Sequence, residues 1–217
     1  MSGLCPQVRD RGLVKGKNKL RVRFGSWNVG TLTGKSIELV KTLTRRRVNI
    51  ACIQETKWVG SKAREIDGFK LWYSRVSKSE NGVGILVDEF LRDQVVDVRR
   101  VNDRIMAIKL VVGMSSLNVV CAYAPQVGLG EEVKASFWEK LDDLVRSIPQ
   151  DELLVIGGDF NGHIGKSEAG FSDVHGGFGF GEGNDSGVSL LDFLVAFDLL
   201  VVNSWFEKKE DHLVTFR

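Results

Sequence analysis

Polar side chains that could hold a metal ion and activate water follow four apolar runs of this sequence. Glu55 follows "IACIQ", and both Asp159 and Asn161 follow "LLVIGG". Asn28 closes "FGSWN", and Tyr123 closes "VVCAY". Short apolar runs predict buried strands, and polar groups at strand ends are where ligands gather in open α/β sheets. The sequence therefore predicts that these five side chains meet in one cleft.

The donor types in this set point to hydrolytic chemistry. Carboxylate and amide oxygens are hard donors, and no Cys or His stands among the five, so the set suits Mg²⁺, or Mn²⁺, better than zinc. One carboxylate can hold the metal while a second takes a proton from water. Gly157 and Gly158 would let the backbone come close to a ligand. Read alone, "GGDFNGHIG" is equally an ordinary turn after a strand.

The elements that must position these residues alternate between strand-like and helix-like runs, which predicts an α/β fold with sheets under helical cover. Apolar residues at helical spacing predict helices over residues 35–47, 131–148 and 187–200. Runs rich in β-branched and aromatic residues predict strands over residues 20–30, 48–55, 69–75, 82–89, 94–101, 104–113, 117–125, 152–161 and 201–205, with another starting at 212. A glycine-dense loop is expected over residues 162–187.

The N-terminal segment is strongly basic. Residues 1–50 hold twelve Lys or Arg against Asp10 and Glu38, although the net charge of the whole chain is only +2. Residues 1–18 show no periodicity, which predicts a flexible basic arm before a folded domain over 19–217. Such an arm favours polyanions such as DNA and fits an intracellular, even a nuclear, protein. A solvated tail that only aids solubility explains it equally well.

Cysteine usage and hydropathy exclude two other classes of protein. The three cysteines, Cys5, Cys52 and Cys121, are odd in number and widely spaced, which indicates reduced thiols and no disulfide-linked partner. No apolar run approaches the length of a membrane span, and the N-terminus lacks the apolar core of a secretory signal. The sequence does not identify protein partners.

The motifs "SWNV", "IQETK", "AYAP" and "GGDFN", in this order, resemble those of the endonuclease/exonuclease/phosphatase family. Their spacing, with "NGHIG" and "HLVTF", looks most like the endonuclease domains of non-LTR retrotransposons and like craniofacial development protein 2-like proteins. The resemblance covers about residues 20–217. It implies a DNase I-like fold, a two-sheet sandwich flanked by helices, with the active site at one end of the sheets. It also implies divalent-metal hydrolysis of phosphoester bonds.

The resemblance assigns a role to each of the five residues. Glu55 would ligate Mg²⁺ (or Mn²⁺), and Asn28 would belong to the same metal site. Asp159 would orient or deprotonate the attacking water. Asn161 would hold a phosphate oxygen, and Tyr123 would direct its hydroxyl at the scissile phosphate.

Three further residues are expected to contact substrate. Lys57 follows Glu55 within "QETK", and Asn184 lies near where family members place an asparagine close to the site. His175 stands in the glycine-rich loop "DVHGGFGFG". The aromatic residues of that loop could contact a nucleobase, and a plain linker is the equal alternative.

Two family motifs do not occur in this sequence. The resemblance implies a late Asp and an Asp-His pair after Asp159, and neither is found before Arg217. The domain over 19–217 is therefore expected to be C-terminally incomplete, without the final strands, and its enzymatic activity to be low. An Mg²⁺-dependent endonuclease acting on DNA is the first hypothesis, and a non-catalytic remnant with weak nucleic-acid or protein binding is the second. A phosphatase acting on small molecules is the third.

Overall fold

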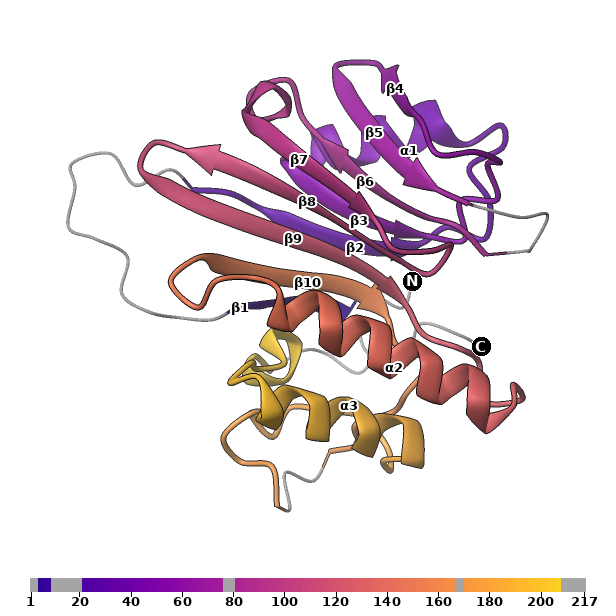
Figure 1. The fold of residues 1–217 in the computed structure, drawn as a ribbon, viewed down its shortest axis with the longest axis vertical. Helices are drawn as coiled ribbons and strands as arrows, with labels where there is room; N and C mark the ends of the chain where they lie inside the picture. The colour runs from indigo at the N-terminus through magenta and orange to yellow at the C-terminus, as the bar shows by residue number, and fades with distance from the viewer. Residues whose placement is uncertain (1–3, 9–20, 76–80, 167–169, 208–217) are drawn as a thin grey trace.

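Two β-sheets pack face to face in the computed structural model, which describes residues 4–8, 21–75, 81–166 and 170–207 (Figure 1). The first sheet has the order β1 (Leu4–Val8), β10 (Leu153–Asp159), β9 (Ser115–Tyr123), β8 (Ile105–Val112) and β7 (Val95–Arg100). The second has the order β2 (Phe24–Asn28), β3 (Ile50–Gln54), β6 (Val83–Val87), β5 (Phe69–Ser74) and β4 (Ala63–Ile66).

Helices cover the outer faces of both sheets. Helix α1 (Ser36–Arg45) lies outside the second sheet, where Leu39, Val40 and Leu43 share a core cluster with its strands. Helices α2 (Glu131–Arg146) and α3 (Asp185–Ala196) lie outside the first sheet (Figure 1). Short 3₁₀ turns follow at η1 (Arg92–Gln94) and η2 (Val202–Trp205). The four layers confirm the predicted sandwich flanked by helices.

The inner faces of the two sheets meet in a dry core. Cys52 and Cys121, from β3 and β9, are buried there as free thiols, as the sequence predicts. The neighbouring Cys121 thiol, together with burial, raises the pKa of Cys52 well above its usual value, so the thiol stays protonated and unreactive. The buried Gln54 amide donates to Ser26 Oγ at 3.2 Å and approaches Cys121 Sγ at 3.4 Å. Its polar atoms are therefore partnered.

The segments that follow β2, β3, β9 and β10 lie at the same end of the sandwich, because these strands form two parallel pairs. Strand β2 runs parallel to β3, with Asn28 opposite Gln54, and β9 runs parallel to β10, with Tyr123 opposite Asp159. Strands β10 and β2 also lie against each other across the two sheets. The carboxyl ends of all four strands consequently open onto one region, and this fixes where the polar side chains gather.

The structure differs from the sequence prediction in three places. Residues 201–205 were expected to be a strand, but they form η2, because the Ser204 amide and hydroxyl both donate to the Val201 carbonyl and close a turn. Residues 4–8 were expected in a flexible arm, but they form β1, antiparallel to β10. Strand β4 was not predicted. The predicted strand from 212, and the rest of the predicted arm, lie outside the described residues.

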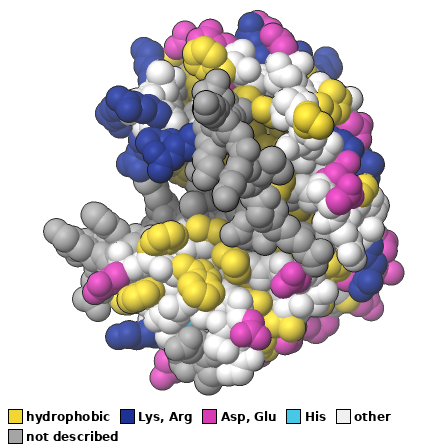
Figure 2. All heavy atoms as spheres, turned by 90° about the vertical axis from the view of Figure 1, so that its left-hand side faces the viewer, with side chains coloured by type: hydrophobic (Ala, Val, Ile, Leu, Met, Phe, Trp, Pro, Cys, Tyr) yellow, Lys and Arg dark blue, Asp and Glu magenta, His cyan; other side chains and the backbone are white. Residues whose placement is uncertain are grey.

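Surface charge is unevenly distributed. On the face shown in Figure 2, Lys and Arg side chains gather at one edge beside a hollow, and hydrophobic side chains lie on its other side.

None of the helices in the described ranges is both long and apolar enough to cross a bilayer. The boundary of the folded domain, set at residue 19 from composition, stays a prediction.

Candidate active site

One amide joins two carboxylates that come from different sheets. Asn28 Nδ2 donates to Glu55 Oε1 at 2.8 Å and to Asp159 Oδ2 at 3.0 Å. The Asn28 oxygen accepts from the Gly30 N–H at 3.1 Å, and this bond fixes the orientation of the amide. As oriented here, the Asn28 amide links the two carboxylates, and its place in a metal site stays a prediction.

The Tyr123 phenol completes this cluster. Its hydroxyl donates to Glu55 Oε1 at 2.9 Å, and Gln126 Nε2 lies 3.5 Å from its oxygen. Burial, followed by the Glu55 carboxylate, raises the pKa of Tyr123 to about 12. The phenol is therefore protonated at neutral pH, where it can donate a hydrogen bond but cannot act as a base.

The turn after β10 orients Asp159 and Asn161 together. The Asn161 N–H donates to Asp159 Oδ1 at 3.1 Å, and Asn161 Nδ2 donates to the Ala124 carbonyl at 2.8 Å. Asn161 has a φ of 49°, in the left-handed region that asparagine tolerates better than most residues. Each Asp159 oxygen accepts one hydrogen bond, so the carboxylate is fixed in direction while 9 % of the residue remains exposed.

The two glycines before Asp159 are required by packing. A Cβ on Gly158 would lie 2.4 Å from the Ala122 carbonyl oxygen of the neighbouring strand. A Cβ on Gly157 would lie 2.9 Å from the sulfur of Cys52 in the opposite sheet. Close approach of a ligand was the reason expected from the sequence, whereas packing against the adjacent strand β9 accounts for Gly158 and packing against the opposite sheet accounts for Gly157.

Lys57 and Glu55 lie in one turn directly after β3. The Lys57 ammonium is 3.7 Å from Glu55 Oε2, and both side chains are partly exposed, so this ion pair is weak. Both residues have positive φ, 55° at Glu55 and 53° at Lys57. The turn thus brings one cation beside the Glu55 carboxylate.

Arg104 supports the phenol and was missed by the sequence reasoning. Its NH1 donates to the carbonyls of Tyr123 at 3.2 Å and Ala124 at 3.3 Å, and its guanidinium lies 5.2 Å from the Tyr123 ring centroid. Arg104 directly precedes β8, which is antiparallel to β9, so its position opposite the end of β9 follows from strand pairing. That pairing was the signal that could have identified it.

Two predicted substrate-binding residues have structural roles. His175 is fully buried, its Nε2 is 3.1 Å from the Gly165 carbonyl oxygen, and its Nδ1 accepts from the Gly177 N–H at 3.0 Å. The Nδ1 atom must then be unprotonated, so Nε2 carries the proton, and neither nitrogen is free for a substrate. Substrate contact by His175 stays a prediction that its burial does not favour. Asn184 caps α3, since its side-chain oxygen accepts from Gly187 N and from His163 N.

The donor chemistry of the cluster fits a hard divalent cation. Glu55 and Asp159 supply carboxylate oxygens, and Mg²⁺ is typically held by one or two carboxylates together with water and substrate oxygens. Within the described ranges, no group of three or more His, Cys, Asp or Glu could form an all-protein cage for a metal. The two carboxylates therefore fit a divalent cation held partly by water and substrate oxygens.

Comparison with known proteins agrees with the geometry. The profile described as "Endonuclease/Exonuclease/phosphatase family" matches residues 25–200. Craniofacial development protein 2 from Bos taurus is 28% identical over 195 residues, which are 89% of this chain and 33% of that protein. The chain thus spans about a third of the length of the curated relatives it matches.

Solved structures share the fold. The endonuclease domain of TRAS1, a telomere-specific non-LTR retrotransposon, superposes with a TM-score of 0.54 at 20% identity, over 82% of this chain and 71% of that one. An AP endonuclease from Archaeoglobus fulgidus superposes with a TM-score of 0.59 at 21% identity, over 81% of this chain and 70% of that one. At these identities the likeness establishes the DNase I-like fold.

Proposed function

The chain belongs to the endonuclease/exonuclease/phosphatase family, and on this premise we propose that it hydrolyses phosphodiester bonds in DNA with the help of Mg²⁺. Members of this family generally use a divalent metal. One observation carries the proposal: two carboxylates, Glu55 and Asp159, share the Asn28 amide beside a protonated phenol. DNA as the substrate is supported by the nucleases among the structural neighbours.

Glu55 is the proposed ligand of the metal ion. The ion is Mg²⁺ in this proposal, and Mn²⁺ could replace it. Glu55 Oε2 lies 3.7 Å from the Lys57 ammonium, whereas Glu55 Oε1 accepts from both Asn28 and Tyr123. A bound Mg²⁺ would polarise the scissile phosphate and assist departure of the leaving oxygen.

The remaining residues would position water and phosphate. Asp159 is held by Asn28 and by the Asn161 N–H, and in this orientation it can take a proton from an attacking water. Asn161 uses one amide N–H on the Ala124 carbonyl and keeps a second for a phosphate oxygen. The Tyr123 hydroxyl, which donates to Glu55 Oε1 in this structure, would turn to hydrogen-bond the same phosphate, and Lys57 would neutralise charge beside it.

The positions of the histidines favour a second function, in which the chain binds DNA but hydrolyses it inefficiently. His175 is buried away from solvent, and His163 follows Asn161 with its backbone tied to Asn184. Among the described residues, no histidine hydrogen-bonds to the carboxylate cluster. An acid or base contributes roughly 10²- to 10⁴-fold to such reactions, so we expect the 217-residue chain to nick DNA slowly while still binding it. A nuclear location stays a prediction.

Nicking of supercoiled plasmid separates these functions. The 217-residue chain is compared with Asp159→Ala, Glu55→Gln and a control, Glu152→Gln, which removes a carboxylate at the opposite end of β10. We expect slow Mg²⁺-dependent nicking that EDTA stops, that Asp159→Ala and Glu55→Gln abolish, and that Glu152→Gln retains. Fast nicking that depends on Asp159 would contradict the low-activity proposal. Nicking that survives both site variants would refute the active site itself. Turnover of p-nitrophenyl phosphate without plasmid nicking would favour a phosphatase.

A further inference from the structure

The turn that carries Glu55 is conformationally costly. Glu55 and Lys57 both adopt positive φ, and neither is a glycine. Left-handed conformations of such residues persist only when the surrounding structure holds them. Within this turn Glu55 directs its carboxylate at Asn28 and Tyr123, so whatever holds the turn also holds the proposed metal ligand.

Backbone contacts from three directions hold the turn. The Thr56 N–H donates to the Gly82 carbonyl at 3.0 Å, and the Thr56 carbonyl accepts from the Leu32 N–H at 3.1 Å. Gly60 and Arg75 exchange both backbone hydrogen bonds at 3.1 Å. The remaining contact comes from a side chain, because Arg75 NH1 donates to the Lys57 carbonyl.

Arg75 is an unusual residue to find at this place. Only 9 % of it is exposed, although it carries a full charge. The salt bridges of the described residues do not include Arg75, and its Nε has no hydrogen-bond partner. Burying a cation is expensive unless it is compensated. The contact that this buried charge makes through NH1 is with a carbonyl inside the strained turn.

We propose that Arg75 is a positioning residue, which holds the Glu55–Lys57 turn through the Lys57 carbonyl and thereby fixes the direction of the Glu55 carboxylate. This inference deepens the proposed function and rests on it for the identity of the metal ligand. Arg75 touches neither metal nor substrate in this proposal. Its guanidinium neutralises the partial charge of a carbonyl that the left-handed turn points inward.

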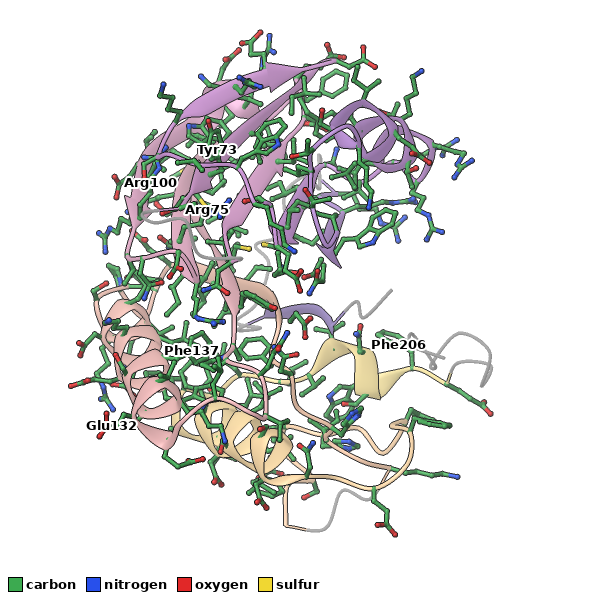
Figure 3. All side chains as sticks on the ribbon, turned by 90° about the vertical axis from the view of Figure 1, so that its right-hand side faces the viewer. Tyr73, Arg75, Arg100, Glu132, Phe137 and Phe206 are labelled. Carbon is green, nitrogen blue, oxygen red and sulfur yellow. The ribbon has the colours of Figure 1, made fainter. Side chains whose placement is uncertain are left out.

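Arg100 provides a matched control in the same region. It also donates to backbone carbonyls, those of Tyr73 at 3.1 Å and Lys62 at 3.3 Å, and neither of these carbonyls belongs to the Glu55–Lys57 turn. Figure 3 shows Tyr73, Arg75 and Arg100 together in the half of the molecule that holds the second sheet. Loss of Arg100 therefore reports on the general cost of removing a carbonyl-binding arginine.

The first test uses the metal-free 217-residue chain. Hydrogen–deuterium exchange of a peptide covering residues 54–60 is measured for wild type, Arg75→Met, Arg75→Lys and Arg100→Met. We expect faster exchange in this peptide for Arg75→Met, a smaller increase for Arg75→Lys, and no increase for Arg100→Met. Unchanged exchange in a folded Arg75→Met protein would overturn the proposal. If Arg75→Met does not fold, an Arg75→Lys protein with wild-type exchange overturns it equally.

The second test measures Mn²⁺ affinity from the free-ion electron paramagnetic resonance signal, together with the melting temperature. Removal of residues that orient metal ligands typically weakens binding by roughly 10- to 100-fold, and we expect Arg75→Met to fall in this range. Arg100→Met should lower the melting temperature while keeping the wild-type affinity. Equal affinity in wild type and Arg75→Met would refute the positioning role. Absence of Mn²⁺ binding in wild type would refute the metal site, and the exchange result would still decide the role of Arg75.

Discussion

The pKa of the Tyr123 phenol is the most direct test of the cluster, because the phenol donates its hydrogen bond to Glu55. The perturbation is Glu55→Gln, made in a Tyr73→Phe background. The chain has only two tyrosines, so Tyr123 is then its only phenol. Burial is the largest cause of the raised pKa, and the hydrogen bond to the Glu55 carboxylate is the second. The charge of Glu55 is the third cause, so the substitution weakens the second, removes the third and keeps the first.

The expected shift follows from the strength of one hydrogen bond. A hydrogen bond to a charged group contributes about 1.5–3 kcal/mol and a neutral one about 0.5–1.5, so the exchange costs about 1–1.5 kcal/mol. At about 1.36 kcal/mol per unit, this lowers the pKa of Tyr123 by about one unit from its value of about 12. The pKa should remain above 10, since the phenol is still buried.

Absorbance of the phenolate at 295 nm after rapid pH jumps measures this pKa, with far-UV circular dichroism to confirm that the chain stays folded. Glu152→Gln in the same background is the matched control. Glu152 is bound by Lys109 and Asn118 at the start of β10, far along the strand from Asp159, and its loss should leave the phenol unchanged. An unchanged pKa in Glu55→Gln would show that Glu55 does not hold the phenol proton. A fall to 10 in a folded protein would show that burial contributes nothing.

Three further outcomes are expected. Because the folded pKa of Tyr123 is raised, its contribution to stability is complete below pH 10 and is lost as the pH rises toward about 12; urea midpoints at pH 9, 10 and 11 should fall in wild type more steeply than in Tyr123→Phe. His175→Ala should lower the free energy of unfolding by about 2–4 kcal/mol, measured in urea, yet keep the wild-type Mn²⁺ affinity, and a weakened affinity in the folded variant would contradict its structural role. Gly157→Ala should cost about 1–3 kcal/mol because its Cβ meets Cys52, whereas Gly128→Ala, with open space around its Cβ, should be neutral; equal melting temperatures for the two variants would speak against the packing account.

The sequence was most informative about groups that sit at strand ends. Asn28, Glu55, Tyr123 and Asp159 each follow an apolar run, and parallel pairing of those runs is enough to bring the side chains together. The strand and helix pattern predicted sheets under helical cover, and the family resemblance implied the two-sheet sandwich. Residues 201–205 were misassigned because a short apolar run does not distinguish a strand from a turn that a serine side chain closes.

The roles of the cations and of His175 could not be read from the sequence. Arg75 and Arg104 donate hydrogen bonds to carbonyls that lie 18 to 20 residues away along the chain, and no sequence periodicity predicts such a contact. His175 stands in a polar, glycine-rich segment, yet packing buries it completely. The direction of the Asn28 amide depends on the Gly30 N–H, which is a matter of local backbone geometry.

The hydrogen bond from Asn28 to Asp159 joins residues 131 positions apart, and this separation sets an order of events during synthesis. At about 5–20 residues per second, a ribosome needs roughly 7–26 s to extend the nascent chain from one partner to the other. All strands of the second sheet lie within residues 24–87 and can pair during that interval. The second carboxylate, Asp159, reaches Glu55 only after β10 has been synthesised and has joined the sheet. A partly made chain accordingly presents Glu55 without Asp159, and the proposed metal site forms only when the sandwich closes.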